Sequence, residues 1–233
     1  MNSESKTSFR LVVFDIAWTT LRDDNAVASA FQKAFAQQGL SIDEADARPL
    51  MGYKKTEAIR TMLDKLDVDT DEETINAIHQ AFVTEMKDHY LHSPSVAPLQ
   101  DAEPMFTLLK EKGIRVAVNT GFTREIADAI LERTQWLEKG LVDDSIASDE
   151  VPLGRPHLYM IQTLMQRAGI EDAAEVIKVG DTEVDVQEGR KAGCALVIGV
   201  TTGAYTREEL LPYAPDYIVD RLSELPAILF DRA

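Results

Sequence analysis

Apolar residues occur along the chain in two spacings, which predict two kinds of element. Short, continuously apolar runs predict buried strands, and longer segments with apolar residues three and four positions apart predict amphipathic helices. Strands that alternate with helices indicate a parallel sheet covered on both faces, because parallel strands need crossover connections. We therefore expect an α/β protein whose strands cover residues 9–14, 115–118, 145–147, 176–179, 195–200 and 217–219.

The interval between the first and second expected strands has helical spacing throughout, and Pro94 and Pro98 follow its last helix. We expect residues 1–23 and 94–233 to form the α/β core. Residues 24–93 are expected to form an all-α unit inserted after the first strand. The helices expected in this unit are 25–38, 43–50, 55–66 and 71–91, and those expected early in the core are 102–112, ended by Gly113, and 124–138, ended by Gly140.

The charge balance is strongly acidic, with 24 Lys and Arg residues against 40 Asp and Glu residues and a formal net charge of −16. Such a field repels nucleic acids and anionic membranes, so we expect neither as a partner. The single cysteine, Cys194, allows no intrachain disulfide. No stretch approaches the ~20 apolar residues of a membrane span, and Met1–Ser8 is polar without a signal-peptide pattern. A cytoplasmic protein is expected.

Polar residues follow four of the expected strands, at the carboxyl ends where open α/β sheets bind ligands. A single Asp at a strand end is more often a turn or helix-cap residue, but four such positions in order indicate a site. Carboxylates gathered at one edge repel unless a hard cation such as Mg²⁺ joins them. Thr120, the Gly121 amide and the Arg155 guanidinium suit phosphate oxygens. The strand-end groups are Asp15, Asn119-Thr120-Gly121, Asp149-Glu150, and Gly180-Asp181-Thr182 with Asp185.

These residues resemble the motifs of the haloacid dehalogenase superfamily, which are an aspartate nucleophile, a Ser or Thr, a Lys or Arg, and a Gly-Asp acidic motif. The resemblance is closest to the phosphonatase-like family of phosphonoacetaldehyde hydrolase and runs from Leu11 to about Gly199. It is carried by Asp15-Ile-Ala17-Trp-Thr-Thr20, Met51-Gly-Tyr-Lys-Lys55, Thr120-Gly-Phe-Thr-Arg-Glu125 and Asp149-Glu-Val-Pro-Leu-Gly-Arg-Pro156.

The resemblance implies a Rossmann-like core with an inserted helical cap and a hydrolase that works through an aspartyl phosphate on Asp15. It implies Mg²⁺ held by Asp15, the Ala17 carbonyl and Asp181, with Asp185 in support. Thr120, Gly121 and Arg155 would bind the phosphoryl oxygens, and Trp18 and Met51 would also face the substrate. The expected substrate is a small phosphonate or related phosphorylated metabolite, and the expected assembly is a monomer or homodimer.

Within this family, the lysine at the position of Lys55 forms a Schiff base with the substrate aldehyde, so that the carbon–phosphorus bond breaks as an enamine forms. The amine must be unprotonated, which requires a lowered pKa. Enclosure between cap and core and the neighbouring Lys54 are the expected causes. The resemblance therefore implies catalytic roles for Lys55 as well as Asp15.

The sequence departs from the phosphonoacetaldehyde hydrolase pattern at three positions. Trp18 replaces a glycine, and a positive φ there would cost on the order of 1 to 3 kcal/mol. Ala17 matches the phosphonatase-like pattern, whereas most superfamily phosphatases have a second Asp there. Ala58 and Phe122 replace a histidine and a tyrosine of phosphonoacetaldehyde hydrolase. Two alternatives stay open: a phosphomonoesterase of the phosphoglycolate phosphatase type, and a binding protein whose site Trp18 has filled.

Overall fold

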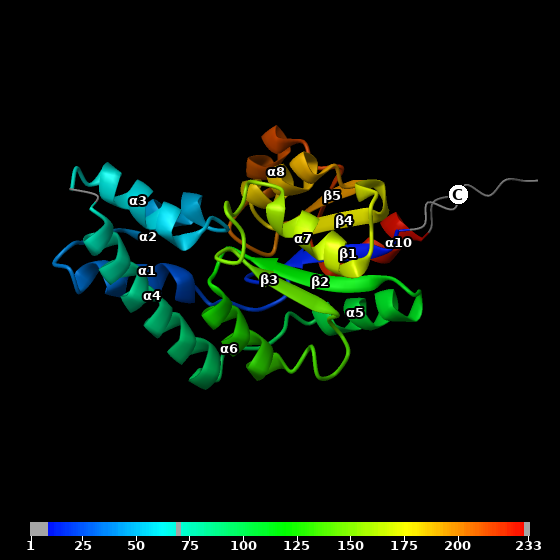
Figure 1. Ribbon diagram of the computed structural model, residues 1–233, viewed down its shortest axis with the longest axis horizontal. Coiled ribbons are helices and arrows are strands. Elements are labelled where there is room, and N and C mark those ends of the chain that lie inside the picture. The colour runs from blue at the N-terminus through cyan, green and yellow to red at the C-terminus, as the bar shows by residue number, and fades with distance from the viewer. Residues whose placement is uncertain (1–8, 69–70, 231–233) are drawn as a thin grey trace, which may run out of the picture.

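The computed structural model describes residues 9–68 and 71–230 (Figure 1); the polar start predicted at Met1–Ser8 lies outside them. The described chain forms a six-stranded, wholly parallel sheet with strand order β3-β2-β1-β4-β5-β6. All six predicted strands are present, with ends that differ by one or two residues. The strands are β1 (Leu11–Asp15), β2 (Arg115–Thr120), β3 (Asp144–Ala147), β4 (Val176–Gly180), β5 (Leu196–Val200) and β6 (Tyr217–Val219).

Helices cover both faces of the sheet, as the continuously apolar strands predicted. Side chains alternate along β1, so Val12 and Phe14 face one layer while Leu11 and Val13 face the other. The first layer contains α5 (Ala102–Glu111), α6 (Arg124–Thr134) and α10 (Leu225–Leu229); the second contains α7 (Tyr159–Ala168), α8 (Glu183–Ala192) and α9 (Arg207–Leu210). Short 3₁₀ helices occur at Ala173–Glu175, Leu211–Tyr213 and Leu222–Glu224.

The described residues between β1 and α5 contain helices and no strand of the sheet. The helices α1 (Ala26–Ala36) and α4 (Glu72–His92) pack together, with the Phe31 and Phe82 rings stacked at 4.4 Å between centroids. The two connecting segments run side by side, because the Arg22 amide donates to the Ala97 carbonyl at 3.0 Å. We call these helices the cap: α1 (Ala26–Ala36), α2 (Glu44–Ala47), η1 (Arg48–Leu50), α3 (Lys55–Lys65) and α4 (Glu72–His92). The division of the chain at residues 23 and 94 stays a prediction.

Two predicted helices differ from the observed ones. The helix predicted at 124–138 ends at Thr134, because Gln135 adopts a left-handed φ of 57°. This turn sends Trp136 into the core, where its ring nitrogen donates to Glu103 at 3.0 Å. The helix predicted at 43–50 changes from α to 3₁₀ at Arg48, where Pro49 lacks the amide that an α-helix needs.

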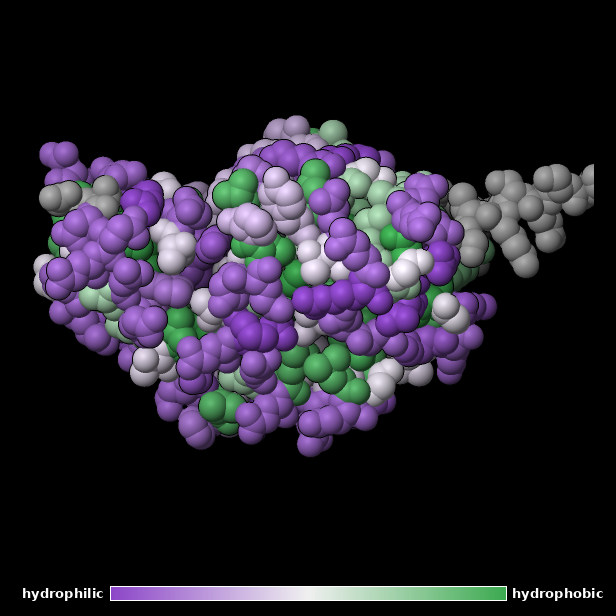
Figure 2. All heavy atoms as spheres, in the orientation of Figure 1, coloured by the Kyte–Doolittle hydropathy of each residue, from purple (hydrophilic) through white to green (hydrophobic). Residues whose placement is uncertain are grey.

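The face of the molecule shown in Figure 2 is mostly hydrophilic, and the apolar residues on it form small patches. In the part of the chain that the structure describes, no helix combines the length and the apolar character needed to cross a membrane.

Candidate active site

A small enclosed cavity of about 20 Å³ lies at the carboxyl ends of the central strands, against the cap. Eight of the ten predicted site residues line it. The other two, Arg155 and Asp185, lie directly behind it in contact with the acidic residues. The lining residues are Asp15, Ala17, Trp18, Val27, Met51, Gly52, Lys55, Thr120, Gly121, Phe122, Asp181 and Thr182.

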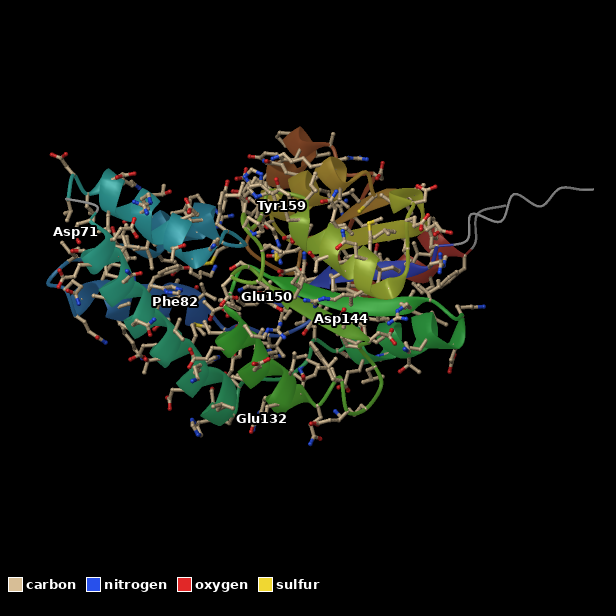
Figure 3. All side chains as sticks on the ribbon, viewed as in Figure 1. Asp71, Phe82, Glu132, Asp144, Glu150 and Tyr159 are labelled. Atoms are coloured by element: carbon tan, nitrogen blue, oxygen red, sulfur yellow. The ribbon has the colours of Figure 1, made fainter. Side chains whose placement is uncertain are left out.

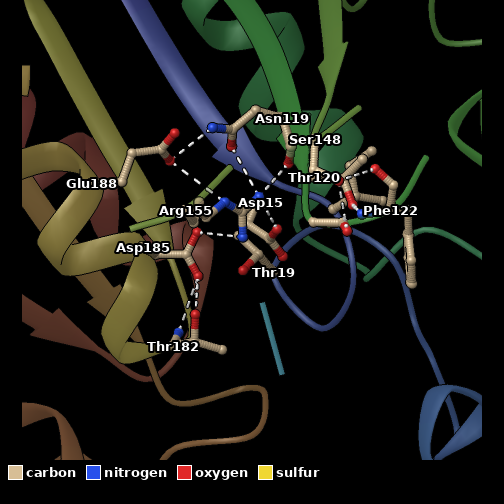
Figure 4. A network of polar contacts seen from close by, with 12 residues as sticks. Asp15, Thr19, Asn119, Thr120, Phe122, Ser148, Arg155, Thr182, Asp185 and Glu188 are labelled. Carbon is tan, nitrogen blue, oxygen red and sulfur yellow. Dashed lines mark hydrogen bonds and ion pairs between the residues drawn. The ribbon is translucent and has the colours of Figure 1, made fainter. Parts of the chain in front are cut away.

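Asp15 ends β1 and is held by Arg155, which is itself fully buried (Figure 4). One guanidinium nitrogen, Nη2, lies 2.6 Å from Asp15 Oδ1, and Nη1 lies 2.9 Å from Asp185 Oδ1. The same Nη2 donates to the Asn119 carbonyl at 2.7 Å. Arginine forms such a fork and lysine does not, so Arg155 fixes the orientation of two carboxylates at once.

A second buried cation, Lys178, lies behind Arg155 and was not among the predicted site residues. Its Nζ lies 2.9 Å from Asp185 Oδ1, 3.6 Å from Glu188 Oε2 and 2.7 Å from Asn119 Oδ1. Glu188 is fully buried and also accepts from the Asn119 amide at 2.8 Å. A lysine within the apolar strand Val176–Gly180 is a sequence signal for such a network, because an unpaired charge there would be costly.

Asp15, Asp181 and Asp185 each offer an oxygen within 4.8 Å of the others, so these buried carboxylates are able to hold a metal ion. Burial raises the pKa of Asp15 and, with added repulsion from Asp15 and Asp185, raises that of Asp181 well above its usual value. A divalent cation with oxygen ligands relieves both effects. The Asp181 carboxylate is held in place by the Thr19 hydroxyl, which donates at 3.1 Å, and the Ala204 amide, which donates at 2.9 Å.

Asp185 has a different environment from the other two carboxylates. Burial opposes its ionisation, but Arg155 and Lys178 outweigh this and lower its pKa below the usual range. One oxygen accepts from the Thr182 hydroxyl and amide, at 2.5 and 3.2 Å, as part of a capping box at the start of α8. With its oxygens already engaged by these groups, Asp185 is better placed to support a metal site than to supply its main ligand.

Thr120 and Gly121 follow β2 and meet the cap loop that precedes α3. The Thr120 hydroxyl accepts from the Phe122 amide at 3.2 Å, which leaves its proton free to point at a bound anion. A Cβ at Gly121 would come closer than 3.0 Å to the carbonyl oxygens of Gly52 and Tyr53. Glycine at this position therefore permits the core and cap backbones to touch.

Lys55 is the first residue of α3 and reaches the cavity from the cap. It is buried, its Nζ donates to the Tyr53 carbonyl at 3.2 Å, and it lies over the Phe122 and Phe31 rings at 5.0 and 5.8 Å. Burial, together with the Arg155 charge, lowers the pKa of Lys55 to about 8. The enclosed setting was predicted as one cause, but the cation that contributes is Arg155 and not Lys54.

Asp149 and Glu150 were expected in the acidic cluster, and this prediction is wrong. Both residues are exposed in the loop after β3, where Figure 3 labels Glu150. Asp149 accepts from the Arg124 amide at 2.8 Å, and Glu150 lies 3.2 Å from Arg124 Nε. They cap and pair the start of α6, the ordinary role of an acid at a strand end.

Trp18 adopts a positive φ of 62° in the turn after β1. Its amide donates to the Leu21 carbonyl at 2.7 Å, and its carbonyl accepts from the Thr202 hydroxyl at 2.5 Å. Non-glycine residues seldom adopt this conformation, which costs on the order of 1 to 3 kcal/mol. These backbone contacts hold Trp18 in place, with its side chain against the cavity.

A buried pair that sequence analysis missed lies close to Lys55. Asp23 is almost fully buried and accepts from the Val27 amide at 3.2 Å and the Tyr90 hydroxyl at 3.4 Å. Burial raises the pKa of Asp23, and the Lys55 charge acts in the opposite direction. Tyr90 packs edge-on against Phe122, with ring centroids 5.9 Å apart. The region around the amine therefore contains a carboxyl and a phenol, although Ala58 and Phe122 provide neither.

Comparison with known proteins identifies the family. The model of the haloacid dehalogenase-like hydrolases matches residues 12–199. A Bacteroides fragilis protein named phosphonoacetaldehyde hydrolase is 31% identical, covering 88% of this chain and 89% of its own. A crystal structure of a phosphonoacetaldehyde hydrolase like protein from Oleispira antarctica superposes with a TM-score of 0.84 at 23% identity, covering 96% of this chain and 92% of that one. One described as a predicted phosphoglycolate phosphatase from Haemophilus somnus gives 0.79 at 18% identity, covering 96% and 99%. The chain is a hydrolase that belongs to the haloacid dehalogenase-like hydrolase family.

Proposed function

We propose that this hydrolase cleaves the carbon–phosphorus bond of a small phosphonate that carries a carbonyl group, of the phosphonoacetaldehyde type, with Mg²⁺ as cofactor. The observation that carries the proposal is the placement of two reactive groups on one cavity: the Asp15 carboxylate from the core and the Lys55 amine from the cap. A simple phosphomonoesterase needs the first group but has no use for a buried amine with a lowered pKa.

Asp15 is the proposed nucleophile at phosphorus. It lies at the end of β1 with one oxygen held by Arg155, so the carboxylate is fixed before substrate arrives. Attack would give an aspartyl phosphate, which water then hydrolyses. Thr120 and Gly121 line the cavity and Arg155 contacts Asp15 directly behind it, which supports a role for these groups in neutralising the phosphonyl oxygens. Positioning with charge stabilisation supplies most of the rate in such transfers.

Mg²⁺ would be held by Asp15 and Asp181, with the Ala17 carbonyl as a third ligand and Asp185 in support. The dense buried carboxylates favour a hard divalent cation, which supplies charge neutralisation at the phosphonyl group. Ala17 lines the cavity where most superfamily phosphatases carry an acid for the leaving alcohol. A carbon leaving group activated as an iminium does not require that acid.

Lys55 is proposed to form this iminium with the substrate carbonyl. A lysine with a pKa of about 8 is unprotonated in an appreciable fraction of molecules near neutral pH, which an ordinary lysine is not. Condensation releases water and places a cationic carbon–nitrogen double bond next to the carbon that bears phosphorus. The electrons of the carbon–phosphorus bond then pass into an enamine, which regains a proton before hydrolysis frees Lys55.

The test is turnover of phosphonoacetaldehyde and phosphoglycolate with Mg²⁺, in wild type and in Asp15→Asn. We expect phosphonoacetaldehyde to be the better substrate, and Asp15→Asn to lower its turnover by on the order of 10³-fold or more. The matched control is Asp149→Asn, which alters a carboxylate that also follows a strand but lies outside the site. Unchanged turnover in Asp15→Asn would refute the nucleophile.

A trapping experiment separates phosphonate cleavage from ester hydrolysis. Borohydride added with a 2-oxoalkylphosphonate should reduce the iminium and attach the ligand to Lys55, as seen by peptide mass. Lys54→Arg is the matched control, since Lys54 is adjacent but half-exposed. Good phosphoglycolate hydrolysis without any trapping at Lys55 would assign the protein to the phosphomonoesterases instead.

A further inference from the structure

The active-site cavity has a larger neighbour across a thin wall. This neighbour, which we call the seam cavity, has a volume of about 240 Å³ and lies between the cap and the loop 201–206 that follows β5. Trp18 and Met51 are the residues that line both cavities. The rest of its lining is largely polar and includes Arg48, Thr201 and Tyr205. The two shared residues therefore form the wall between a site for the reacting group and a space beyond it.

Of the two wall residues, Trp18 is the fixed one. Both backbone polar groups of Trp18 are engaged, by Leu21 and Thr202. A Cβ at Gly203 would lie 2.7 Å from the Trp18 Cβ, so the loop after β5 packs directly against the base of the indole. Met51 is unbranched, belongs to the cap and adapts its shape easily. The limit on what fits in the active-site cavity is therefore set by Trp18.

The available space makes this limit severe. A cavity of about 20 Å³ holds little more than a single water molecule once the cap is closed. A phosphonyl group can replace water among Arg155, Thr120 and the carboxylates, but a leaving group longer than a short carbon chain would have to cross the wall. Beyond the wall, the seam cavity is lined by Thr201, Tyr205 and Arg48, whose guanidinium pairs with Glu209 at 2.6 Å.

We propose that Trp18 is the residue that restricts this enzyme to the smallest phosphonates, and that the seam cavity is a latent subsite which accepts larger phosphonyl ligands once the indole is removed. The inference rests on the proposed phosphonate site. It assigns to Trp18 a role in substrate selection rather than in chemistry.

The test is a binding measurement, because binding separates size selection from turnover. Calorimetry with Mg²⁺ would compare methylphosphonate with cyclohexylphosphonate, which is bulky and cannot stack on an aromatic ring as an arene would. Wild type should bind methylphosphonate at least tenfold more tightly. Trp18→Gly should bind cyclohexylphosphonate at least tenfold more tightly than wild type does. Trp136→Phe, which changes the buried core tryptophan, should keep the wild-type preference.

Trp18→Asn gives a second route if the glycine variant does not fold, because asparagine is short and tolerates a positive φ. Equal affinity of wild type for both ligands, or an unchanged preference in the folded Trp18 variants, overturns the inference. Failure of the proposed function gives a different result from failure of this inference. In that case methylphosphonate would bind and the size preference would change as expected, but phosphonoacetaldehyde would not be cleaved. Wild type that binds neither ligand contradicts both proposals.

Discussion

The Lys55 amine lies 5.0 Å from the centre of the Phe122 ring and donates a hydrogen bond to the Tyr53 backbone carbonyl at 3.2 Å. An ammonium in this position is poorly solvated, since aromatic faces replace water on one side and, among the residues that the structure describes, one acceptor serves its three N–H donors. The structure therefore favours the neutral amine more than bulk water does. This relationship connects the packing of the cap against the core with the reactivity proposed for Lys55.

Imine formation at Lys55 should follow the pKa of about 8. The neutral amine is the reactive form, so the rate of borohydride-dependent trapping with a 2-oxoalkylphosphonate should rise with pH and level off above about 8, and not near the usual lysine value of 10.5. The rate is measured by mass spectrometry of the Lys55 peptide between pH 6 and 10, in steps. A rate that still rises steeply above pH 9.5 would contradict the shift.

The negative charge of Asp23 stabilises the Lys55 ammonium, so Asp23 should keep the pKa of Lys55 higher than it would otherwise be. Asp23→Asn keeps an acceptor for the Val27 amide but removes the charge, so the trapping profile should move to lower pH. Asp24→Asn is the matched control, since Asp24 is the next residue but exposed. An identical pH profile in Asp23→Asn, with the fold intact, would show that Asp23 acts only as a cap for the start of α1.

Lys55→Met should raise the stability of the protein while it abolishes trapping. Below pH 8 the lysine is charged in both states, and the shift from 10.5 to about 8 corresponds to a folding penalty of roughly 3 kcal/mol. The penalty declines as pH rises from 8 to 10.5. In this range Lys55 is neutral in the folded protein, and the lysine of the unfolded chain becomes progressively easier to deprotonate. The gain in unfolding free energy should therefore be large at pH 7 and small at pH 10.5. A gain that does not change with pH would point to packing alone.

The sequence predicted the fold and most of the cavity because strand ends and apolar spacing are local signals. It did not predict the second half of the charge network. Lys178 belongs to β4, and Asp185 and Glu188 reach its amine only because α8 folds back and packs on the strand that precedes it. The prediction for Asp149 was wrong because its position after a strand is only a local signal. The preceding strand, β3, lies at the edge of the sheet, so Asp149 contacts solvent and the Arg124 amide.

Lys178→Met should destabilise the protein by about 3 to 5 kcal/mol, because it removes one of the two cations that neutralise the buried Asp185 and Glu188 carboxylates and leaves them to share Arg155. Glu188 loses the Nζ at 3.6 Å and Asp185 loses the one at 2.9 Å. The double variant Lys178→Met with Glu188→Gln should recover part of the loss, since one of the two carboxylates that then share Arg155 is neutralised as well. The free energies of unfolding of wild type, the two single variants and the double variant are measured by chemical denaturation. Strictly additive losses would mean that the two residues do not act as a pair.

Gly121→Ala should impair closure of the cap more than it impairs folding. The added Cβ would meet the carbonyl oxygens of Gly52 and Tyr53 closer than 3.0 Å, and backbone atoms at this distance must move away. Lys55 follows that loop, so its amine would shift relative to Asp15; a displacement of about 1 Å costs on the order of 10²-fold in turnover.

Gly154→Ala is the graded control, because its Cβ would meet the Lys54 side chain at 3.2 Å, a contact that a small movement relieves. We expect turnover in Gly121→Ala to fall by far more than in Gly154→Ala, with both unfolding free energies near that of wild type. Equal turnover in the two variants would mean that close backbone contact between cap and core is not required for catalysis.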